Sequence, residues 1–138
     1  IESGVENAIK NYDIAIDCTD NFSARYAIND ACVAQGKPNI YGSVVRFEGQ
    51  LTVFAPNGPC YRCLFPTQPK NIQTCSDVGI FGVLAGMIGT MQAMEAIKLI
   101  VGKGEPMKGR MLIFDALKNE FKYLQLPKQK NCICWRLK

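Results

Sequence analysis

The stretch IAIDCTDNFSARYAINDACVAQGKPNIYGSVVR, residues 14–46, predicts a β-α-β unit. The short apolar run at 14–16 indicates a buried strand, and Ala, Ile and Val at helical spacing over 22–35 indicate a helix that stops at Gly36. Lys37-Pro38 then leads into a second strand at about 39–46. Because such a connection is almost always a right-handed crossover, we expect two parallel strands and an α/β fold.

Three further strands are expected after this unit. The turn at 47–49 brings the chain back into an antiparallel strand at 50–55, and 110–114 and 120–126 form a last hairpin. The resulting sheet is mixed.

Between these strands, residues 78–101 (VGIFGVLAGMIGTMQAMEAIKLIV) predict a long buried helix that ends at Gly102. Polar Gln92, Glu95 and Lys98 interrupt its last third, which favours a core helix over a membrane span. Four glycines share one helical stripe. This stripe predicts close approach of another backbone, in this chain or in a partner. The four are Gly79, Gly82, Gly86 and Gly89.

The composition limits the chemistry. The 138 residues are enough for one domain, and the net charge of +4 without a basic stripe interleaved with aromatics argues against nucleic-acid binding. The absence of histidine excludes Ser-His-Asp and Cys-His catalytic pairs and any histidine metal ligand. Seven cysteines behind a polar, leaderless N-terminus indicate a reducing, cytoplasmic setting with metal-binding or catalytic thiols. The polar N-terminal segment is expected to be linker-like, so we interpret the chain as a fragment.

Asp17-Cys18-Thr19-Asp20-Asn21 follows the first strand and precedes the first helix. Open α/β sheets bind ligands at the carboxyl ends of their strands. Asp20 could hold magnesium against nucleotide phosphates, with Asn21 as a hydrogen-bonding companion, or could simply cap the helix. The two roles are compatible. No glycine-rich phosphate loop follows any expected strand, so the phosphate-binding half of such a fold is expected to be missing.

Two cysteine pairs predict a structural zinc site with four sulfur ligands. Cys60-x-x-Cys63 is the usual half-site, and Cys132-x-Cys134 lies near the C-terminus. The second pair has one intervening residue instead of two, so its backbone must adjust for both sulfurs to reach one metal.

The other cysteines have different settings. Cys75 lies in a polar loop just before the long helix and is either a nucleophile, stabilised as a thiolate by the helix N-terminus, or a passive loop cysteine. Cys18 and Cys32 fall among apolar residues and are expected in the core.

Taken in order, IDCTDNFSARYAINDACV, VRFEGQLTVF, GPCYRCLFP, a cysteine before DVGIFGVLAGMIGTMQAMEAIKLI, and the final cysteine pair resemble the MoeB/ThiF/HesA family. These proteins are ubiquitin-activating-like adenylyltransferases for small sulfur-carrier or ubiquitin-like proteins. The resemblance covers nearly the whole chain and is strongest to the type that serves molybdopterin synthesis and tRNA thiolation. That type usually continues into a rhodanese domain, which is not present in this sequence.

The resemblance implies the C-terminal half of a Rossmann-like ubiquitin-activating fold with a zinc-clipped C-terminus. Asp20 and Asn21 match the acid-amide pair of the ATP and magnesium site, and Arg25 matches an arginine of the same motif. The zinc ligands implied are Cys60, Cys63, Cys132 and Cys134. Cys75 matches a loop cysteine that carries an acyl thioester or a disulfide in several members.

The resemblance also implies a reaction. The parent enzyme would adenylate the C-terminal glycine of a ubiquitin-like sulfur-carrier protein and release pyrophosphate, using glycines and basic residues that lie upstream of the DCTDN motif in the family. It implies a homodimer and no direct nucleic-acid or membrane partner. Two rivals remain: a non-catalytic module that docks a carrier protein or a dimer partner, and a thiol-disulfide protein that uses Cys60 and Cys63.

Overall fold

The computed structural model describes residues 2–69 and 79–136, which form a mixed five-stranded sheet in the order β1-β2-β3-β4-β5. β1 and β2 run parallel and every other neighbouring pair is antiparallel. The predicted β-α-β unit, the antiparallel return and the last hairpin are therefore confirmed. The strands are β1 (Ala15–Asp17), β2 (Asn39–Val45), β3 (Glu48–Phe54), β4 (Arg110–Asp115) and β5 (Glu120–Gln125).

Five helices accompany the sheet in the described part of the chain. Two of them match the expected helices, whereas the N-terminal segment forms a helix in place of the expected linker-like segment. The two shortest consist of a single turn and each contains one cysteine. The helices are α1 (Glu2–Ile9), α2 (Phe22–Ala34), α3 (Tyr61–Leu64), α5 (Gly82–Val101) and α6 (Ile133–Arg136).

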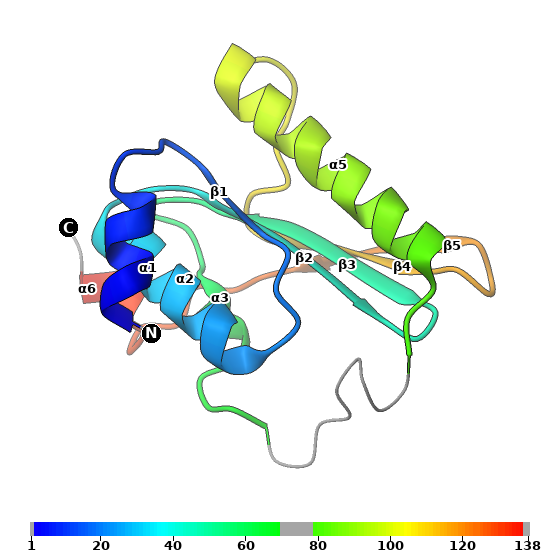
Figure 1. Cartoon of the computed structure of the whole chain (residues 1–138), viewed down its shortest axis with the longest axis horizontal. Coiled ribbons are helices and arrows are strands. Elements are labelled where there is room, and N and C mark those ends of the chain that lie inside the picture. Colours follow the sequence, from blue (N-terminus) through cyan, green and yellow to red (C-terminus); the bar gives the residue numbers. More distant parts are fainter. Residues whose placement is uncertain (1, 70–78, 137–138) are drawn as a thin grey trace.

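The sheet separates two apolar layers, with α5 on one face and α2 and α3 on the other (Figure 1). Successive residues of β2 alternate between them, because side chains of a strand point to opposite faces. Ile40 packs with Met91 and Leu99 of α5. Tyr41 instead packs with Tyr61 of α3 and with aromatic residues of α2. Helix α2 ends just before Gly36, whose left-handed φ of 62° is typical of the residue that follows a helix C-terminus.

The long helix differs from its prediction in two ways. It begins at Gly82 rather than at residue 78, and only one of its faces is buried. The buried residues are Leu84, Ile88, Gln92 and Glu95. Helix α5 is long and apolar enough to cross a membrane, but this is weak evidence because core helices pass the same test. On its buried face Gln92 bonds to β1 and β2, and Glu95 accepts a hydrogen bond from Met107 N–H, which fits a core helix better.

The glycine stripe does not touch another backbone within the described residues. A Cβ added at Gly82, Gly86 or Gly89 would meet nothing within 4 Å. Among residues 2–69 and 79–136, the within-chain alternative for this stripe is therefore not borne out. Close approach depends instead on glycines of the sheet: a Cβ at Gly42 would lie 2.4 Å from Gln92, and one at Gly49 would lie 2.6 Å from Ile88.

Candidate functional site

The four paired cysteines meet in one buried cluster. Cys60 precedes α3 and Cys63 lies within its single turn, so both thiols point from the same turn. Cys132 precedes α6 and Cys134 lies within it. The one-residue gap of the second pair is accommodated because a tight turn runs into α6 here, in which Trp135 N–H donates to the carbonyl of Cys132. The expected adjustment of the backbone is thus present.

The geometry of this cluster suits a tetrahedral metal site. All four sulfur atoms lie within 4.8 Å of one another, and the Cys60–Cys132 and Cys63–Cys134 Sγ pairs are each 3.4 Å apart. Zinc–sulfur bonds of about 2.3 Å in a tetrahedron place sulfurs about 3.8 Å apart. The cluster therefore fits a zinc ion with only small adjustments, and its four protein ligands leave no open coordination position.

The thiols of the cluster differ in acidity. Burial raises the pKa of Cys60 to about 11, and the hydrogen bond with Cys132 adds to the effect. Burial also raises the pKa of Cys134. Burial opposes ionisation of Cys63 too, but backbone hydrogen bonds from Cys60 and Gln129 outweigh it and hold the pKa of Cys63 below its ordinary value. A dication would therefore have to displace protons from Cys60 and Cys134 in order to bind.

The predicted DCTDN loop lies at the carboxyl end of β1 and is held by hydrogen bonds of its own side chains. Asp17 is 1% exposed, and its Oδ1 accepts hydrogen bonds from the Thr19 N–H at 2.9 Å and hydroxyl at 2.7 Å. Asn21 caps α2, because its Oδ1 accepts from Ala24 N–H at 2.8 Å. Asn21 rather than Asp20 is therefore the cap. The exposed Asp20 carboxylate accepts from Asn21 Nδ2 at 3.3 Å.

Arg25 holds this loop against β2. Its guanidinium donates twice to the carbonyl of Thr19, at 3.2 and 3.0 Å, and once to the hydroxyl of Ser43 at 2.9 Å. The side chain is 7% exposed and lies over the ring of Tyr41. These bonds define Arg25 as a residue that positions the loop.

Gln92 of α5 also belongs to this site, although in the sequence it marks only a polar interruption of the helix. It donates to the carbonyls of Asp17 and Ile40, at 2.9 and 3.0 Å, and is 3% exposed. The available signal was its spacing: Leu84, Ile88 and Gln92 recur every four residues, so the glutamine continues the buried face.

Some of these residues line a cavity of about 160 Å³ at the carboxyl ends of the two parallel strands. Its wall includes Asp20 and Arg25 from the loop region, Gly42 and Ser43 from β2, and Gln92 from α5. Such an edge is where open α/β sheets bind ligands. The structure thus brings Asp20 and Arg25 to one cavity. Asn21 supports it as the helix cap.

The remaining cysteines separate. Cys32 is buried as expected, and burial raises its pKa to about 11. The core prediction for Cys18 is wrong: this residue is exposed, lines the cavity at the strand ends, and its Sγ donates to Gln92 Oε1 at 3.5 Å. Cys75 lies outside the described residues.

Comparison with known proteins agrees with this architecture. The family model described as ThiF family matches residues 2–136. Adenylyltransferase and sulfurtransferase MOCS3 of Drosophila grimshawi is 48% identical over 126 residues, which make up 88% of this chain and 28% of that protein. Adenylyltransferase and sulfurtransferase MOCS3-1 of Zea mays is 52% identical over 120 residues, covering 85% and 26%. The chain spans little more than a quarter of these curated relatives.

Solved structures support the fold alone, because their sequences are distant. E. coli MccB with ATP has a TM-score of 0.74 at 18% identity, covering 95% of this chain and 43% of that chain. MccB in complex with N-formylated MccA has a TM-score of 0.76 at 15% identity, covering 94% and 44%.

The fold and its two sites define an α/β protein with a four-cysteine centre at one end of its sheet and a polar loop at the other. The chain belongs to the ThiF family.

Proposed function

We propose that this chain is the C-terminal part of an ATP-dependent adenylyltransferase domain that activates the C-terminal glycine of a ubiquitin-like sulfur-carrier protein for sulfur transfer. The observation that carries the proposal is the position of Asp20 at the strand-end cavity, in a chain about half identical to relatives named adenylyltransferase and sulfurtransferase. The nucleotide-binding half would lie upstream.

The proposed reaction joins two substrates at the strand-end cavity. A carboxylate oxygen of the carrier's terminal glycine attacks the α-phosphorus of ATP, pyrophosphate leaves, and a mixed acyl-phosphate anhydride forms. Asp20 is the carboxylate that would hold the magnesium accompanying ATP. Asn21 and Arg25 fix the loop so that Asp20 keeps its place, and their own polar atoms are engaged with protein groups.

We further propose that the four-cysteine centre holds zinc with a structural role. A closed four-thiolate site supplies folding free energy and no open position for chemistry. It joins the segment after β3 to the C-terminal segment, which are more than 70 residues apart in sequence. Such a site needs reduced thiols, which supports a cytoplasmic location. Zinc binding would also rule out the thiol-disulfide rival that uses Cys60 and Cys63.

Cys75 is proposed as a covalent acceptor on sequence grounds alone. Its thiolate would attack the carbonyl carbon of the acyl adenylate, forming a thioester and releasing AMP. Trapping carrier and ATP with a longer protein that includes the upstream half, with and without reductant, tests this. A Cys75→Ala variant should lose the thiol-sensitive adduct and keep pyrophosphate exchange. An adduct that persists in the variant would exclude the role.

Carrier-dependent pyrophosphate exchange tests the proposed function itself. In the longer protein, Asp20→Ala should abolish exchange, whereas Asp13→Ala, at an exposed position before β1, should leave it unchanged. The 138 residues alone should show none. Robust exchange by this chain alone, or equal exchange in the Asp20 and Asp13 variants, would contradict the proposal.

The alternative is a non-catalytic module that docks a carrier protein or a second copy of the chain. The apolar outer face of α5 favours it, since Val83 is 79% and Ile100 72% exposed. Large exposed apolar surfaces often mark interfaces. A homodimer through this face is compatible with the adenylyltransferase proposal, so association without pyrophosphate exchange in the longer protein would be needed to favour the docking module.

A further inference from the structure

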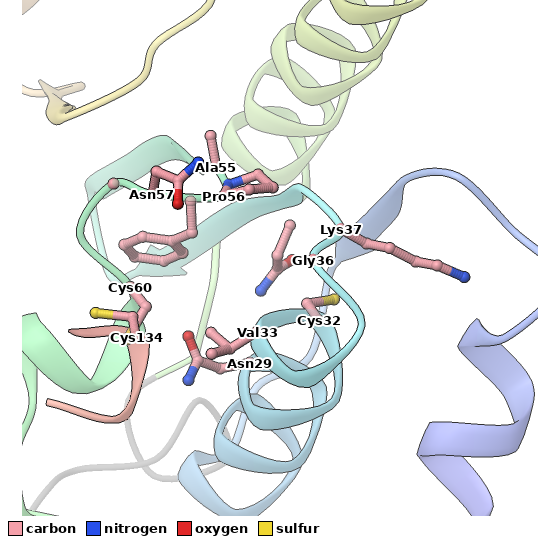
Figure 2. Close-up of a pocket in the computed structure, with 13 residues that line it drawn as sticks. Asn29, Cys32, Val33, Gly36, Lys37, Ala55, Pro56, Asn57, Cys60 and Cys134 are labelled. Atoms are coloured by element: carbon pink, nitrogen blue, oxygen red, sulfur yellow. The ribbon is translucent and has the colours of Figure 1, made fainter. Parts of the chain in front are cut away.

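A second cavity lies at the amino end of β2, away from the cavity that contains Asp20. Its volume is about 90 Å³. Figure 2 shows its walls: Val33 and Gly36 from the end of α2 face the turn with Ala55, Pro56 and Asn57, while Cys60 and Cys134 of the cysteine centre stand at one end. Gly36, Pro56 and Asn57 are exposed, so the mouth opens to solvent between the two turns.

Asn39, the first residue of β2, lines this cavity with an unpaired amide. The residue is 1% exposed, and neither Oδ1 nor Nδ2 has a hydrogen-bond partner in the described part of the chain. Exchanging the two atoms would not alter this, because both are unpaired. Buried side-chain amides in folded proteins almost always have partners. The cavity therefore offers one donor group and one acceptor side by side.

Two other polar side chains of the wall, those of Asn29 and Lys37, are engaged elsewhere, and that of Asn57 lies at the exposed mouth. Asn29 accepts a hydrogen bond from Tyr61 N–H at 2.8 Å. The ammonium of Lys37 donates to the carbonyls of Ile9 and Lys10 at the end of α1, and Figure 2 shows its side chain pointing away from the cavity. Lys37, the one cationic side chain of the wall, is therefore turned away from Asn39, so an anionic ligand would gain no charge pairing there.

The size and lining define the ligand further. A cavity of this volume has room for several waters or for a ligand of a few non-hydrogen atoms. Beside Asn39, the wall offers apolar groups such as Val33, Phe54 and Ala55. A matching ligand has a short alkyl group and a neutral head that both donates and accepts hydrogen bonds.

We propose that this cavity binds a short aliphatic molecule that carries a neutral primary carboxamide. The carboxamide of the ligand pairs with that of Asn39 through two hydrogen bonds, and its alkyl group fills the space between Val33 and Phe54. The site is independent of the proposed adenylation, because it lies at the other end of the sheet.

Titration of the zinc-loaded protein with propionamide tests this site, using the NMR signals of the Asn39 side-chain amide. For a ligand of five heavy atoms we expect saturable shifts with a Kd of about 1–10 mM. Two probes of nearly the same shape isolate the contacts. Butanone lacks the donor and propionate is charged, and each should bind at least about fivefold more weakly because a hydrogen bond or a charge is left unpaired.

Variants provide the second arm. Asn39→Leu should lose propionamide binding, followed through backbone signals of the cavity wall, and Asn11→Leu, at an exposed turn, should retain it. The proposal is overturned if propionamide gives no saturable shift up to about 200 mM, far above the Kd such a ligand should have; water alone would then satisfy Asn39. Equal binding by butanone also overturns it. Should Asn39→Leu fail to fold, the three-probe comparison on the unaltered protein still decides.

Discussion

The side chain of Gln92 lies against the backbone of Gly42 so closely that a Cβ at Gly42 would come within 2.4 Å of it. This contact lets Gln92 reach the carbonyls of Asp17 and Ile40. One side chain of α5 thereby links the carboxyl end of β1 to β2. Because Asp17 begins the loop that carries Asp20, the position of Asp20 depends on a residue 72 positions further along the chain.

Replacing Gly42 with alanine should displace the Gln92 amide and break its two buried hydrogen bonds. We expect a loss of about 1–3 kcal/mol in the free energy of unfolding, measured by urea denaturation of the zinc-loaded protein. Gly86→Ala is the control: it adds a methyl group into open space on a helix and should stabilise by up to about 1 kcal/mol. Equal stability of the Gly42 variant and the unaltered protein would contradict the role given to this contact.

The glycine stripe of α5 gives a prediction about association. Gly86→Leu should weaken self-association, seen by light scattering at high concentration, without destabilising the fold, because nothing lies within 4 Å of the added Cβ. Gly49→Leu is the contrasting variant, since its side chain would collide with Ile88 and unfold the protein at lower urea concentration. A clean monomer before any substitution would exclude a dimer through this face.

Much of this architecture could be predicted from the sequence, because the deciding signals are local. Helical spacing over 22–35 and the Lys37-Pro38 break determine the β-α-β unit, and the cysteine spacing indicates the metal centre. The glycines were harder: the sequence shows that Gly86 and Gly42 exist, but only the packing of α5 on the sheet shows which of them permits close approach. Cys32 is buried and Cys18 is exposed because of how α2 and the loop after β1 are oriented, which the sequence does not show.

Zinc removal should act first on the C-terminal segment. The purified, reduced protein should contain about one zinc per chain, and chelation should make the region of α6 susceptible to protease before the sheet unfolds. Cys134→Ser should weaken zinc binding as strongly as Cys63→Ser, because both sulfurs belong to the same cluster. Metal analysis that finds no zinc, or full affinity in the Cys134 variant, would contradict the four-ligand centre.

Alkaline pH should destabilise the protein through Cys32. Burial raises the pKa of this thiol from 9.0 to about 11, so the folded state favours the protonated form. Its contribution is complete below about pH 9 and is lost as the pH rises through about 11, by about 2 kcal/mol in the free energy of unfolding. The free energy of unfolding, measured by urea titration, should fall less from pH 8 to pH 11 in Cys32→Ala than in the unaltered protein. Equal losses would assign the alkaline effect to other groups, such as the buried tyrosines.

Comparing Asn39 with Asn29 measures the free-energy cost of burying a side-chain amide that has no hydrogen-bond partner. Both residues are 1% exposed, but Asn29 accepts a hydrogen bond from Tyr61 N–H whereas the amide of Asn39 has no partner in the described residues. Replacing an unpaired polar group with an apolar one removes a desolvation penalty, and the cavity beside Asn39 has room for the larger leucine side chain. Asn39→Leu should therefore raise the free energy of unfolding by about 1–2 kcal/mol.

Asn29→Leu should lower it by about 1–3 kcal/mol, because it leaves a buried backbone N–H without an acceptor. Urea denaturation of both variants at one zinc concentration gives the comparison. If Asn39→Leu destabilises the protein as much as Asn29→Leu does, water in the cavity already satisfies the Asn39 amide.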